Sequence, residues 1–294
     1  MKATLDLRFE AIGTAWSVEV YEAVSALAAR QIEQAVLARI EEFDRNYSRF
    51  RPDSLVAKMA AQAGDFELPA DAEPLFDIYH QLYQLTDGRF TPLIGQTLSD
   101  AGYDTDYSLK PRPLVAPPAW EVALDYKFPQ LSLRRPALLD VGAAGKGYLV
   151  DLVSELVESF GLTNYCVDAG GDMRHRGSGS EPMRVGLEHP ADPAQVVGVV
   201  ELTNASLCGS AGNRRAWGEY HHILNPQTLS SPRHIQAVWV TAATTLLADA
   251  LTTALFLVDA ASLTRYYDFE YALIAADGTA WQSTAFPGEF FTAT

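Results

Sequence analysis

The sequence predicts an α+β fold with mixed or antiparallel sheets, and three observations lead to this class. Segments with strand character and segments with helical periodicity are interspersed, without the regular strand–helix–strand alternation of a parallel sheet. The sequence contains no repeat of the length found in solenoid proteins. The length of 294 residues, 48% of them hydrophobic, supplies a core for one large domain or two intimate lobes.

The charge balance excludes some classes of partner. The chain carries 37 acidic and 22 basic side chains, a formal net charge of −15. Such a surface disfavours binding of nucleic acid or anionic lipid through bulk charge. A polyanionic substrate would need a local source of positive charge, which a bound divalent metal supplies. The two cysteines are too few for a disulfide framework.

The first part of the chain contains helices with clear apolar periodicity. Apolar residues recur every three or four positions from Val24 to Tyr47, which predicts one long amphipathic helix. Around it the patterns predict a strand over 9–21 broken at Gly13-Thr14, a turn at 51–53, and short helices over 54–63 and 74–86.

The rest of the chain begins with a proline-rich stretch over 104–136, which we expect to mark a lobe junction or surface excursion. Strands are possible there over 120–126 and 130–133. The later patterns predict a strand at 138–141, a glycine-rich loop at 142–147, a helix over 149–160 ended by Gly161, a strand at 165–168, a helix over roughly 244–258 and a closing strand at 271–275.

The glycine-rich loop Gly142–Gly147 contains Lys146 and lies between a predicted strand and a predicted helix. Loops of this kind bind phosphates through backbone N–H groups, the positive helix end and the lysine charge. The spacing is neither that of a Walker A loop nor that of a dinucleotide fingerprint. Taken alone, the loop fits a phosphate site and a purely structural turn equally well.

Asp249 and Thr253 lie four residues apart on the predicted helix over 244–258, so both side chains share one face. An oxygen pair of this kind suits Mg²⁺. The structural alternative is an aspartate that complements the helix dipole and a threonine in the core.

The sequence has two adjacent histidines, His221 and His222, next to an Asn-Pro turn. Neighbours on a strand point to opposite faces, so the pair cannot chelate one metal. One of them could act as a general base, because histidine titrates near neutral pH. The other four histidines show no ligand spacing and fit surface or core positions.

These features occur in the order found in the ApbE family, the FAD:protein FMN transferases, which this chain resembles across most of its length. The matching segments are Ile12-Gly13-Thr14 for M-G-T, SRFRPDS (48–54) for S-x-Y-x-x-x-S, DVGAAGKGYLVD (140–151) for D-L-G-x-I-A-K-G-Y-x-V-D, VDAGGD (167–172) for V-N-x-G-G-D, HILNPQT (222–228) for H-I-I-D-P-R-T, and ADALTTAL (248–255) for A-D-A-L-A-T-A-L. Each motif is weak alone, but six in the same order make coincidence improbable.

The resemblance implies roles for particular residues and an ApbE-like, two-lobed catalytic domain over 1–294. Asp249, Thr253 and the backbone carbonyl of Ala143 would hold Mg²⁺ against the pyrophosphate of FAD. His222 would assist attack by the acceptor hydroxyl, with Asp249 as the second catalytic residue. The residues expected to line the FAD site are Ile12, Phe50, Arg89, Phe90, Asp140, Lys146, Ile223 and Thr252.

The chain departs from the family pattern at several positions. Where the family usually has G-A-F-D, this chain has Gly88-Arg89-Phe90-Thr91, so Thr91 replaces the aspartate. Asn225 replaces the aspartate of H-I-I-D-P, and Leu229 replaces the glycine after its threonine. Phe50 stands for a tyrosine but keeps the stacking face, and Gly145 replaces an alanine.

The function implied by the resemblance is Mg²⁺-dependent transfer of FMN from FAD to a threonine hydroxyl of an acceptor flavoprotein, with release of AMP. The alternatives are a FAD pyrophosphatase that uses water, a FAD-binding protein without catalysis, and a scaffold that binds no flavin. The sequence shows neither a signal-peptide pattern nor a lipobox, and no stretch apolar enough to span a bilayer. We therefore expect a cytoplasmic location and no nucleic-acid partner.

Overall fold

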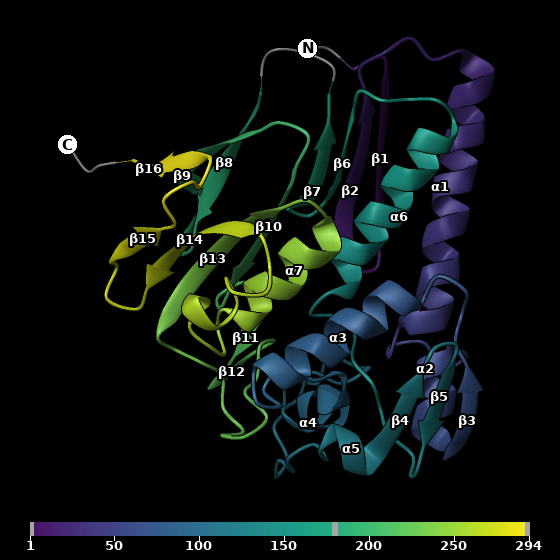
Figure 1. Cartoon of the computed structure of the whole chain (residues 1–294), viewed down its shortest axis with the longest axis vertical. Coiled ribbons are helices and arrows are strands. Elements are labelled where there is room, and N and C mark those ends of the chain that lie inside the picture. The colour runs from purple at the N-terminus through teal and green to yellow at the C-terminus, as the bar shows by residue number, and fades with distance from the viewer. Residues whose placement is uncertain (1–2, 178–181, 292–294) are drawn as a thin grey trace.

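The main sheet of the protein has eight strands, all paired antiparallel, in the order β1-β2-β6-β7-β10-β13-β14-β15 (Figure 1). We describe it from a computed structural model, which covers residues 3–177 and 182–291. The strands are β1 (Leu5–Ala11), β2 (Thr14–Val20), β6 (Tyr165–Ala169), β7 (Asp172–Arg176), β10 (Ser206–Ala211), β13 (Ile235–Ala242), β14 (Phe269–Ala275) and β15 (Ala280–Gln282). With the helices that cover it, this sheet confirms the α+β class.

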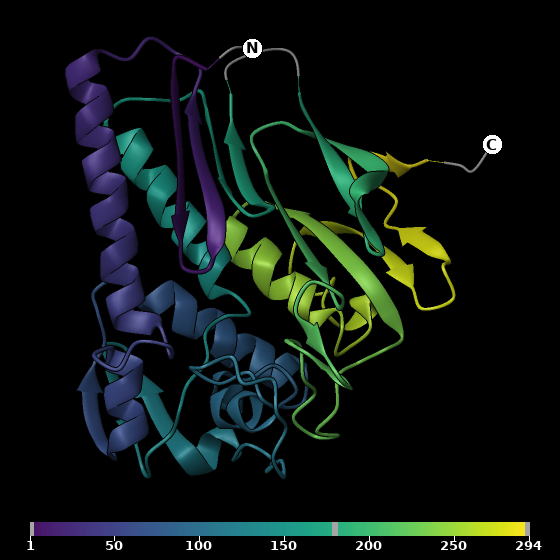
Figure 2. The same ribbon diagram turned by 180° about the vertical axis from the view of Figure 1, so that it is seen from behind.

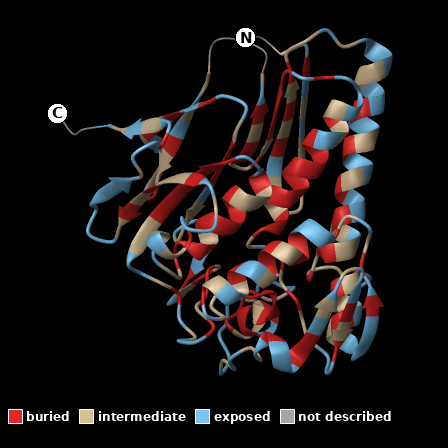
Figure 3. Cartoon of the chain, in the orientation of Figure 1, coloured by how far each residue is buried: buried red, intermediate tan, exposed pale blue. Residues whose placement is uncertain are grey.

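One face of the sheet is covered by three helices, α1 (Ala26–Tyr47), α6 (Gly145–Ser159) and α7 (Thr245–Ala254). Helix α1 begins where the Ser25 hydroxyl accepts a hydrogen bond from the Ala28 N–H. The predicted stripe of apolar residues faces the core, with Ile32, Val36, Ile40, Phe43 and Tyr47 all buried. Figure 3 shows that α6 and α7, which lie between α1 and the sheet centre, are buried along most of their length.

The opposite face carries a second core under a small antiparallel sheet, β16-β9-β8. Its strands are β8 (Met183–His189), β9 (Asp192–Leu202) and β16 (Gly288–Phe290). Leu187 of this sheet packs in one cluster with Met173 and Trp239 of the main sheet. Figure 2 shows this side of the molecule, with β8 and β9 beside the main sheet.

A third group of elements lies at the lower end of the molecule in Figure 1. It comprises α2 (Leu55–Ala61), β3 (Gly64–Glu67), α3 (Glu73–Leu85), η1 (Pro92–Ile94), α4 (Gly95–Asp100), α5 (Trp120–Ala123), β4 (Leu124–Lys127) and β5 (Gln130–Leu133). Strands β3, β5 and β4 form an antiparallel sheet, so part of the expected junction segment pairs with residues 64–67. The remaining elements are the hairpin β11 (Ala216–Trp217) and β12 (Tyr220–His221), and η2 (Ala260–Ser262).

Several predicted elements differ from those observed. The strand predicted over 9–21 is a hairpin, because Ile12 and Gly13 adopt positive φ and reverse the chain between β1 and β2. Residues 138–141 are not a strand: Asp140 donates its N–H to Pro92 in η1, and Ala137 donates to Met59, so no ladder forms. Residues 120–123 form a helical turn, the last helix ends at Ala254, and β15 and β16 follow the strand expected to close the fold.

The start of α7 is fixed by a carboxylate from α6. Both oxygens of Asp151 accept backbone N–H groups of α7, from Thr245 at 2.9 Å and from Leu246 at 2.7 Å. These N–H groups have no partner inside their own helix, so the contact caps α7 and orients it against α6. The two helices that position the candidate site are therefore joined directly.

Within the described residues, no helix is both long enough and apolar enough to cross a lipid bilayer.

Candidate active site

A cavity of about 820 Å³ opens between the lower group of elements and the helical face of the main sheet. Its size is that of a typical cofactor pocket. The lining comes from the β1–β2 turn, the end of α1, the segment 89–103, the loop 140–146, the region from β10 to residue 224, and α7. The cavity contains almost all the residues that the sequence assigned to the site. They are Ile12, Phe50, Arg89, Phe90, Asp140, Ala143, Lys146, His222, Ile223, Asp249 and Thr253.

Thr252 is the exception among the predicted residues. Its side chain is fully buried and is not among the described groups that line the cavity. The hydroxyl donates to the carbonyl of Asp249 at 2.7 Å and lies 2.9 Å from the Ser210 hydroxyl of β10. Thr252 therefore connects α7 to the sheet behind the site.

The glycine-rich loop uses its backbone N–H groups for contacts within the protein. Gly142 donates to Asp140 at 2.7 Å, Ala143 donates to the Tyr79 hydroxyl at 3.2 Å, and Gly147 donates to Asp249 at 2.8 Å. The N–H groups of residues 144 and 145 donate to Val141. These N–H groups therefore act as in a structural turn, which is one of the two interpretations that the sequence left open.

The same turn leaves an acceptor available. Because Gly147 donates to the Asp249 carboxylate, it does not donate to the carbonyl of Ala143 one turn earlier, and no other described residue does so. Ala143, with its carbonyl oxygen free of donors among the described residues, lines the same cavity as Asp249 and Thr253, and all three residues offer the hard oxygen ligands that Mg²⁺ prefers. The described residues contain no cluster of three or more His, Cys, Asp or Glu side chains that could hold a metal. Any cation here would therefore be bound as Mg²⁺ often is, by few protein oxygens together with substrate and water.

Two carboxylates and one ammonium belong to the lining of the cavity, those of Asp172, Asp249 and Lys146. Lys146 forms an ion pair with Asp172 and donates to the carbonyl of Ala169 at 2.9 Å. Burial lowers the pKa of Lys146, but the charges of Asp172 and Asp249 outweigh it, and the net shift is upward. Burial and the neighbouring Asp172 raise the pKa of Asp249 well above its usual range. This group has an excess of negative charge, which a bound cation would offset.

His222 faces the cavity from the strand end after β12. Its N–H donates to the Arg215 carbonyl at 3.1 Å, while its ring Nδ1 is buried and has no hydrogen-bond partner in the described structure. Burial, followed by the nearby positive charge of Arg215, lowers the pKa of His222 to about 3. The ring is therefore neutral at physiological pH and can accept a proton.

The adjacent His221 points elsewhere, as the strand geometry predicts. It is buried, and its Nε2 lies 2.9 Å from the Pro232 carbonyl. Its Nδ1 accepts the N–H of Ile223 at 3.2 Å, so this ring organises the turn that carries the cavity residues.

An aromatic group forms one wall of the cavity. The Phe50 ring stacks on Tyr107, with centroids 5.3 Å apart and planes 7° from parallel, and meets Tyr103 edge-on. The Arg49 guanidinium lies 4.2 Å from the centre of the Phe50 ring and pairs with Asp140 at 2.5 Å. A flat aromatic surface of this kind suits a stacked ring system.

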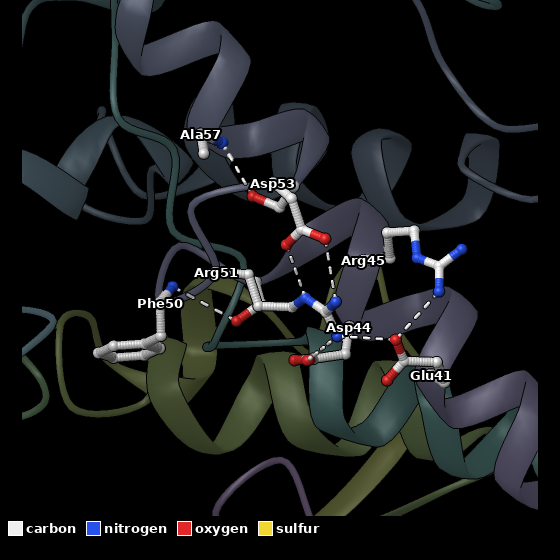
Figure 4. Close-up of polar contacts among 9 residues, drawn as sticks. Glu41, Asp44, Arg45, Phe50, Arg51, Asp53 and Ala57 are labelled. Atoms are coloured by element: carbon white, nitrogen blue, oxygen red, sulfur yellow. Dashed lines mark hydrogen bonds and ion pairs between the residues drawn. The ribbon is translucent and has the colours of Figure 1, made fainter.

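The backbone beside Phe50 is anchored by an ionic network (Figure 4). The Arg51 guanidinium contacts Asp53 at 3.0 Å, Glu41 at 2.9 Å and Asp44 at 3.2 Å. Figure 4 shows the Phe50 ring pointing away from these carboxylates. A single exposed ion pair contributes little stability. Here three carboxylates contact one guanidinium, and we infer that together they fix the backbone segment that presents Phe50.

The structure also accounts for the departures from the family pattern. Thr91 is buried, and its hydroxyl accepts the Leu93 N–H at 3.2 Å to start η1. Asn225 accepts the Gln227 N–H at 2.9 Å within its turn. Leu229 has a φ of 55°, a conformation that favours the glycine found there in the pattern.

Sequence reasoning missed several cavity residues, among them Arg49, Tyr103, Asp172 and Arg215. Arg49 and Asp172 fall inside the quoted motifs, so their position in a motif was an available signal. Tyr103 and Arg215 fall outside the motifs, and only the folded chain brings them to the site.

Gly147 allows the close approach of α6 and α7. A Cβ at this position would lie 2.5 Å from the Cβ of Asp249 and 2.8 Å from the carbonyl carbon of Thr245. We expect Gly147→Ala to lower the free energy of unfolding by about 1–3 kcal/mol, because two packed helices must separate. Denaturant unfolding would measure the change.

The matched control is Gly145→Ala in the same loop. Its Cβ would meet only side chains, Val141 at 3.3 Å and the Phe43 ring at 3.6 Å, and alanine favours the helix that starts there. This variant should be as stable as the parent or more so, by up to about 1 kcal/mol. Equal losses in both variants would contradict the role given to Gly147.

Comparisons with known proteins agree with this geometry. The sequence model of the ApbE family matches residues 12–274. The chain is 23% identical to the FAD:protein FMN transferase of Haemophilus influenzae over 86% of this chain and 80% of that protein. It is 27% identical to the protein of the same name from Rhodobacter capsulatus, over 84% of this chain and 50% of that protein.

Solved structures show the same fold. The flavin transferase ApbE from Vibrio cholerae superposes with a TM-score of 0.82 at 21% identity, covering 96% of this chain and 97% of that one. The ApbE protein of Thermotoga maritima gives 0.81 at 23% identity, covering 95% and 96%. With the family model matched from the β1–β2 turn to β14, the chain belongs to the ApbE family.

Proposed function

We propose that this chain is a transferase that moves FMN from FAD to a threonine hydroxyl of an acceptor flavoprotein and releases AMP, with Mg²⁺ bound at the site. The observation that carries the proposal is the cavity itself, which brings Asp249, Thr253, the free carbonyl of Ala143 and the neutral His222 together beside an aromatic wall. Membership of the ApbE family and the shared name of its curated relatives support flavin transfer.

The residues present fit the proposed metal. Asp249, the Thr253 hydroxyl and the Ala143 carbonyl would hold Mg²⁺, which prefers oxygen ligands. When bound, the ion supplies positive charge that neutralises the pyrophosphate and the departing AMP. Burial and, after it, the neighbouring Asp172 raise the pKa of Asp249, and a bound cation would favour its ionised form.

The remaining steps belong to this chain's residues and to the substrates. The Phe50 wall would orient the flavin ring, and Lys146 would remain held by Asp172 near the phosphates. The acceptor oxygen forms a bond to the FMN-side phosphorus, and the bond from that phosphorus to the oxygen bridging to AMP breaks. The hydroxyl proton passes to the neutral ring of His222, and the negative charge of FAD favours this by raising the pKa of the ring.

Two other outcomes share the same cavity. If water takes the place of the acceptor hydroxyl, the products are FMN and AMP, as for a FAD pyrophosphatase. If the altered Thr91 and Asn225 positions remove the chemistry, the protein binds FAD without cleaving it. The domain organisation stays part of the proposal: one catalytic domain over 1–294, whose two lobes meet near 104–136.

AMP release distinguishes these possibilities. The protein is incubated with FAD and Mg²⁺, with a candidate acceptor flavoprotein or with the same acceptor whose target threonine is alanine. The transferase predicts AMP and covalently bound flavin only with the intact acceptor. AMP released at the same rate in all samples would favour the pyrophosphatase, and bound FAD without AMP would favour the non-catalytic binder.

A further inference from the structure

Most positively charged side chains in the cavity are already paired with carboxylates. Lys146 pairs with Asp172, Arg49 with Asp140, and Arg51 with Asp53. Arg214 pairs with Glu188 at 2.6 Å. These charges are largely balanced by the protein, and a dianionic substrate needs more positive charge than they leave.

Two lining arginines have no carboxylate within 4.0 Å in the described parts of the chain, Arg89 and Arg215. Arg89 is held at the rim, where it donates to the Gln227 side chain at 3.2 Å and to the Thr86 carbonyl at 3.4 Å. Among the residues that the structure describes, the Arg215 guanidinium makes one hydrogen bond, from Nη1 to the Tyr103 hydroxyl at 3.2 Å. Its other N–H groups have no acceptor within that part of the chain and are available to a ligand.

The location of Arg215 is defined from two sides. Through Tyr103 it touches the aromatic wall that contains Phe50. Its backbone carbonyl accepts the N–H of His222 at 3.1 Å, and Arg215 lines the same cavity as His222 and Asp249. The guanidinium is thus beside the aromatic wall, in the cavity that also contains the proposed metal and proton-acceptor groups.

The order in which the groups of FAD are joined determines which of them lies next to Arg215. Its flavin ring is joined through a ribityl chain to one phosphate, and that phosphate is joined to AMP. With the ring against Phe50 and the pyrophosphate near Asp249, the FMN-side phosphate must lie between them. We propose that Arg215 binds this FMN-side phosphate of FAD through paired guanidinium hydrogen bonds, an inference that rests on the proposed function.

This contact has a defined chemical role. A guanidinium matches two phosphate oxygens in a bidentate fashion and neutralises charge as the phosphorus changes partners. In phosphoryl transfer most of the catalysis comes from such positioning and charge stabilisation. Arg215 forms and breaks no covalent bond and transfers no proton, because an arginine stays protonated.

Binding of FMN and riboflavin tests the proposal without requiring turnover. Riboflavin carries the flavin ring and ribityl chain but no phosphate. Affinities are measured by flavin fluorescence, in the presence of Mg²⁺, for the parent protein, Arg215→Met, Arg215→Lys and the control Arg214→Met. AMP affinity is measured on the same proteins by calorimetry.

We expect Arg215→Met to weaken FMN binding by about 10–100-fold, the loss typical of a hydrogen bond to a charged group. Riboflavin and AMP affinities should change by less than about twofold, within ordinary variation. Arg215→Lys should lose less FMN affinity than Arg215→Met, because it keeps the charge. Arg214→Met should leave FMN affinity unchanged, since Glu188 already binds that side chain.

Several results would overturn the proposal. Equal loss of riboflavin affinity would mean that Arg215 supports the pocket shape, and a loss confined to AMP would place it at the other phosphate. The same loss in Arg214→Met would indicate a general charge effect, and no loss of FMN affinity in Arg215→Met would remove the contact altogether. A protein that shows the expected discrimination yet never releases AMP from FAD would support this role of Arg215 and contradict the transferase.

Discussion

Asp249→Asn should slow AMP release from FAD by about 100–1,000-fold, the loss typical when a group that stabilises developing charge is removed. The substitution keeps the side-chain shape, and its oxygen can still accept the Gly147 N–H that Asp249 accepts at 2.8 Å. The packing of α6 on α7 should therefore survive, while the charge needed to hold Mg²⁺ is lost. Initial rates are followed by chromatography of AMP over a range of Mg²⁺ concentrations.

Asp168→Asn is the matched control for this variant. Asp168 is a half-buried carboxylate that, like Asp249, accepts a backbone N–H, from Gly171 at 2.7 Å, but it lines a neighbouring cavity. Its variant should keep the rate within about threefold of the parent. An Asp249→Asn protein that remains folded and retains the parent rate and Mg²⁺ dependence would show that Asp249 is only a capping residue.

His222→Gln should lower kcat by about 100–10,000-fold, the contribution usual for a general base. FAD affinity should change little, because glutamine occupies a similar volume and keeps a polar group in the cavity. The control is His221→Gln, whose parent ring bonds the Pro232 carbonyl on the other side of the chain. It should reduce thermal stability, and kcat of the folded protein should fall by less than about tenfold, because the ring holds the turn at Ile223 but does not line the cavity.

The pH profile gives an independent check on His222. Its pKa is lowered to about 3, mainly by burial, so the ring stays in its neutral, proton-accepting form above that pH. Since kcat/KM reports ionisations of the free enzyme, protonation of His222 should cause no loss of kcat/KM for FAD between pH 8 and about pH 5. A loss with a midpoint near 6.5, absent from His222→Gln, would mean that the ring is more exposed to solvent than the structure shows.

Local sequence signals predicted the helices well because their causes lie close together in the chain. The apolar stripe of α1, the Ser54 cap of α2 and the left-handed Gly161 after α6 each depend on residues within one or two turns. Strand pairing depends on distant partners. Residues 138–141 have the composition of a strand, yet their neighbours are Pro92 and Met59, so they form no ladder.

The candidate site shows the same difference between features set by nearby residues and features set by distant ones. The motifs carried Asp249, Lys146 and His222, and all three line one cavity. Composition could not show whether the N–H groups of the glycine-rich loop were free, because their acceptors Tyr79 and Asp249 lie 64 and 102 positions away. Composition also could not identify Arg215 as a ligand-binding residue, because that inference depends on which other cationic side chains of the cavity are already paired with carboxylates.

The 102-residue separation between Gly147 and Asp249 also bears on the synthesis of the protein. At cellular translation speeds, the loop leaves the ribosome about 5–20 s before its carboxylate partner does. During that interval α6 lacks the helix that packs against it and the Gly147 N–H lacks its acceptor, so the nascent chain exposes apolar surface to chaperones. The cavity that we propose for FAD is complete only after α7 has docked, because α7 carries Asp249 and Thr253.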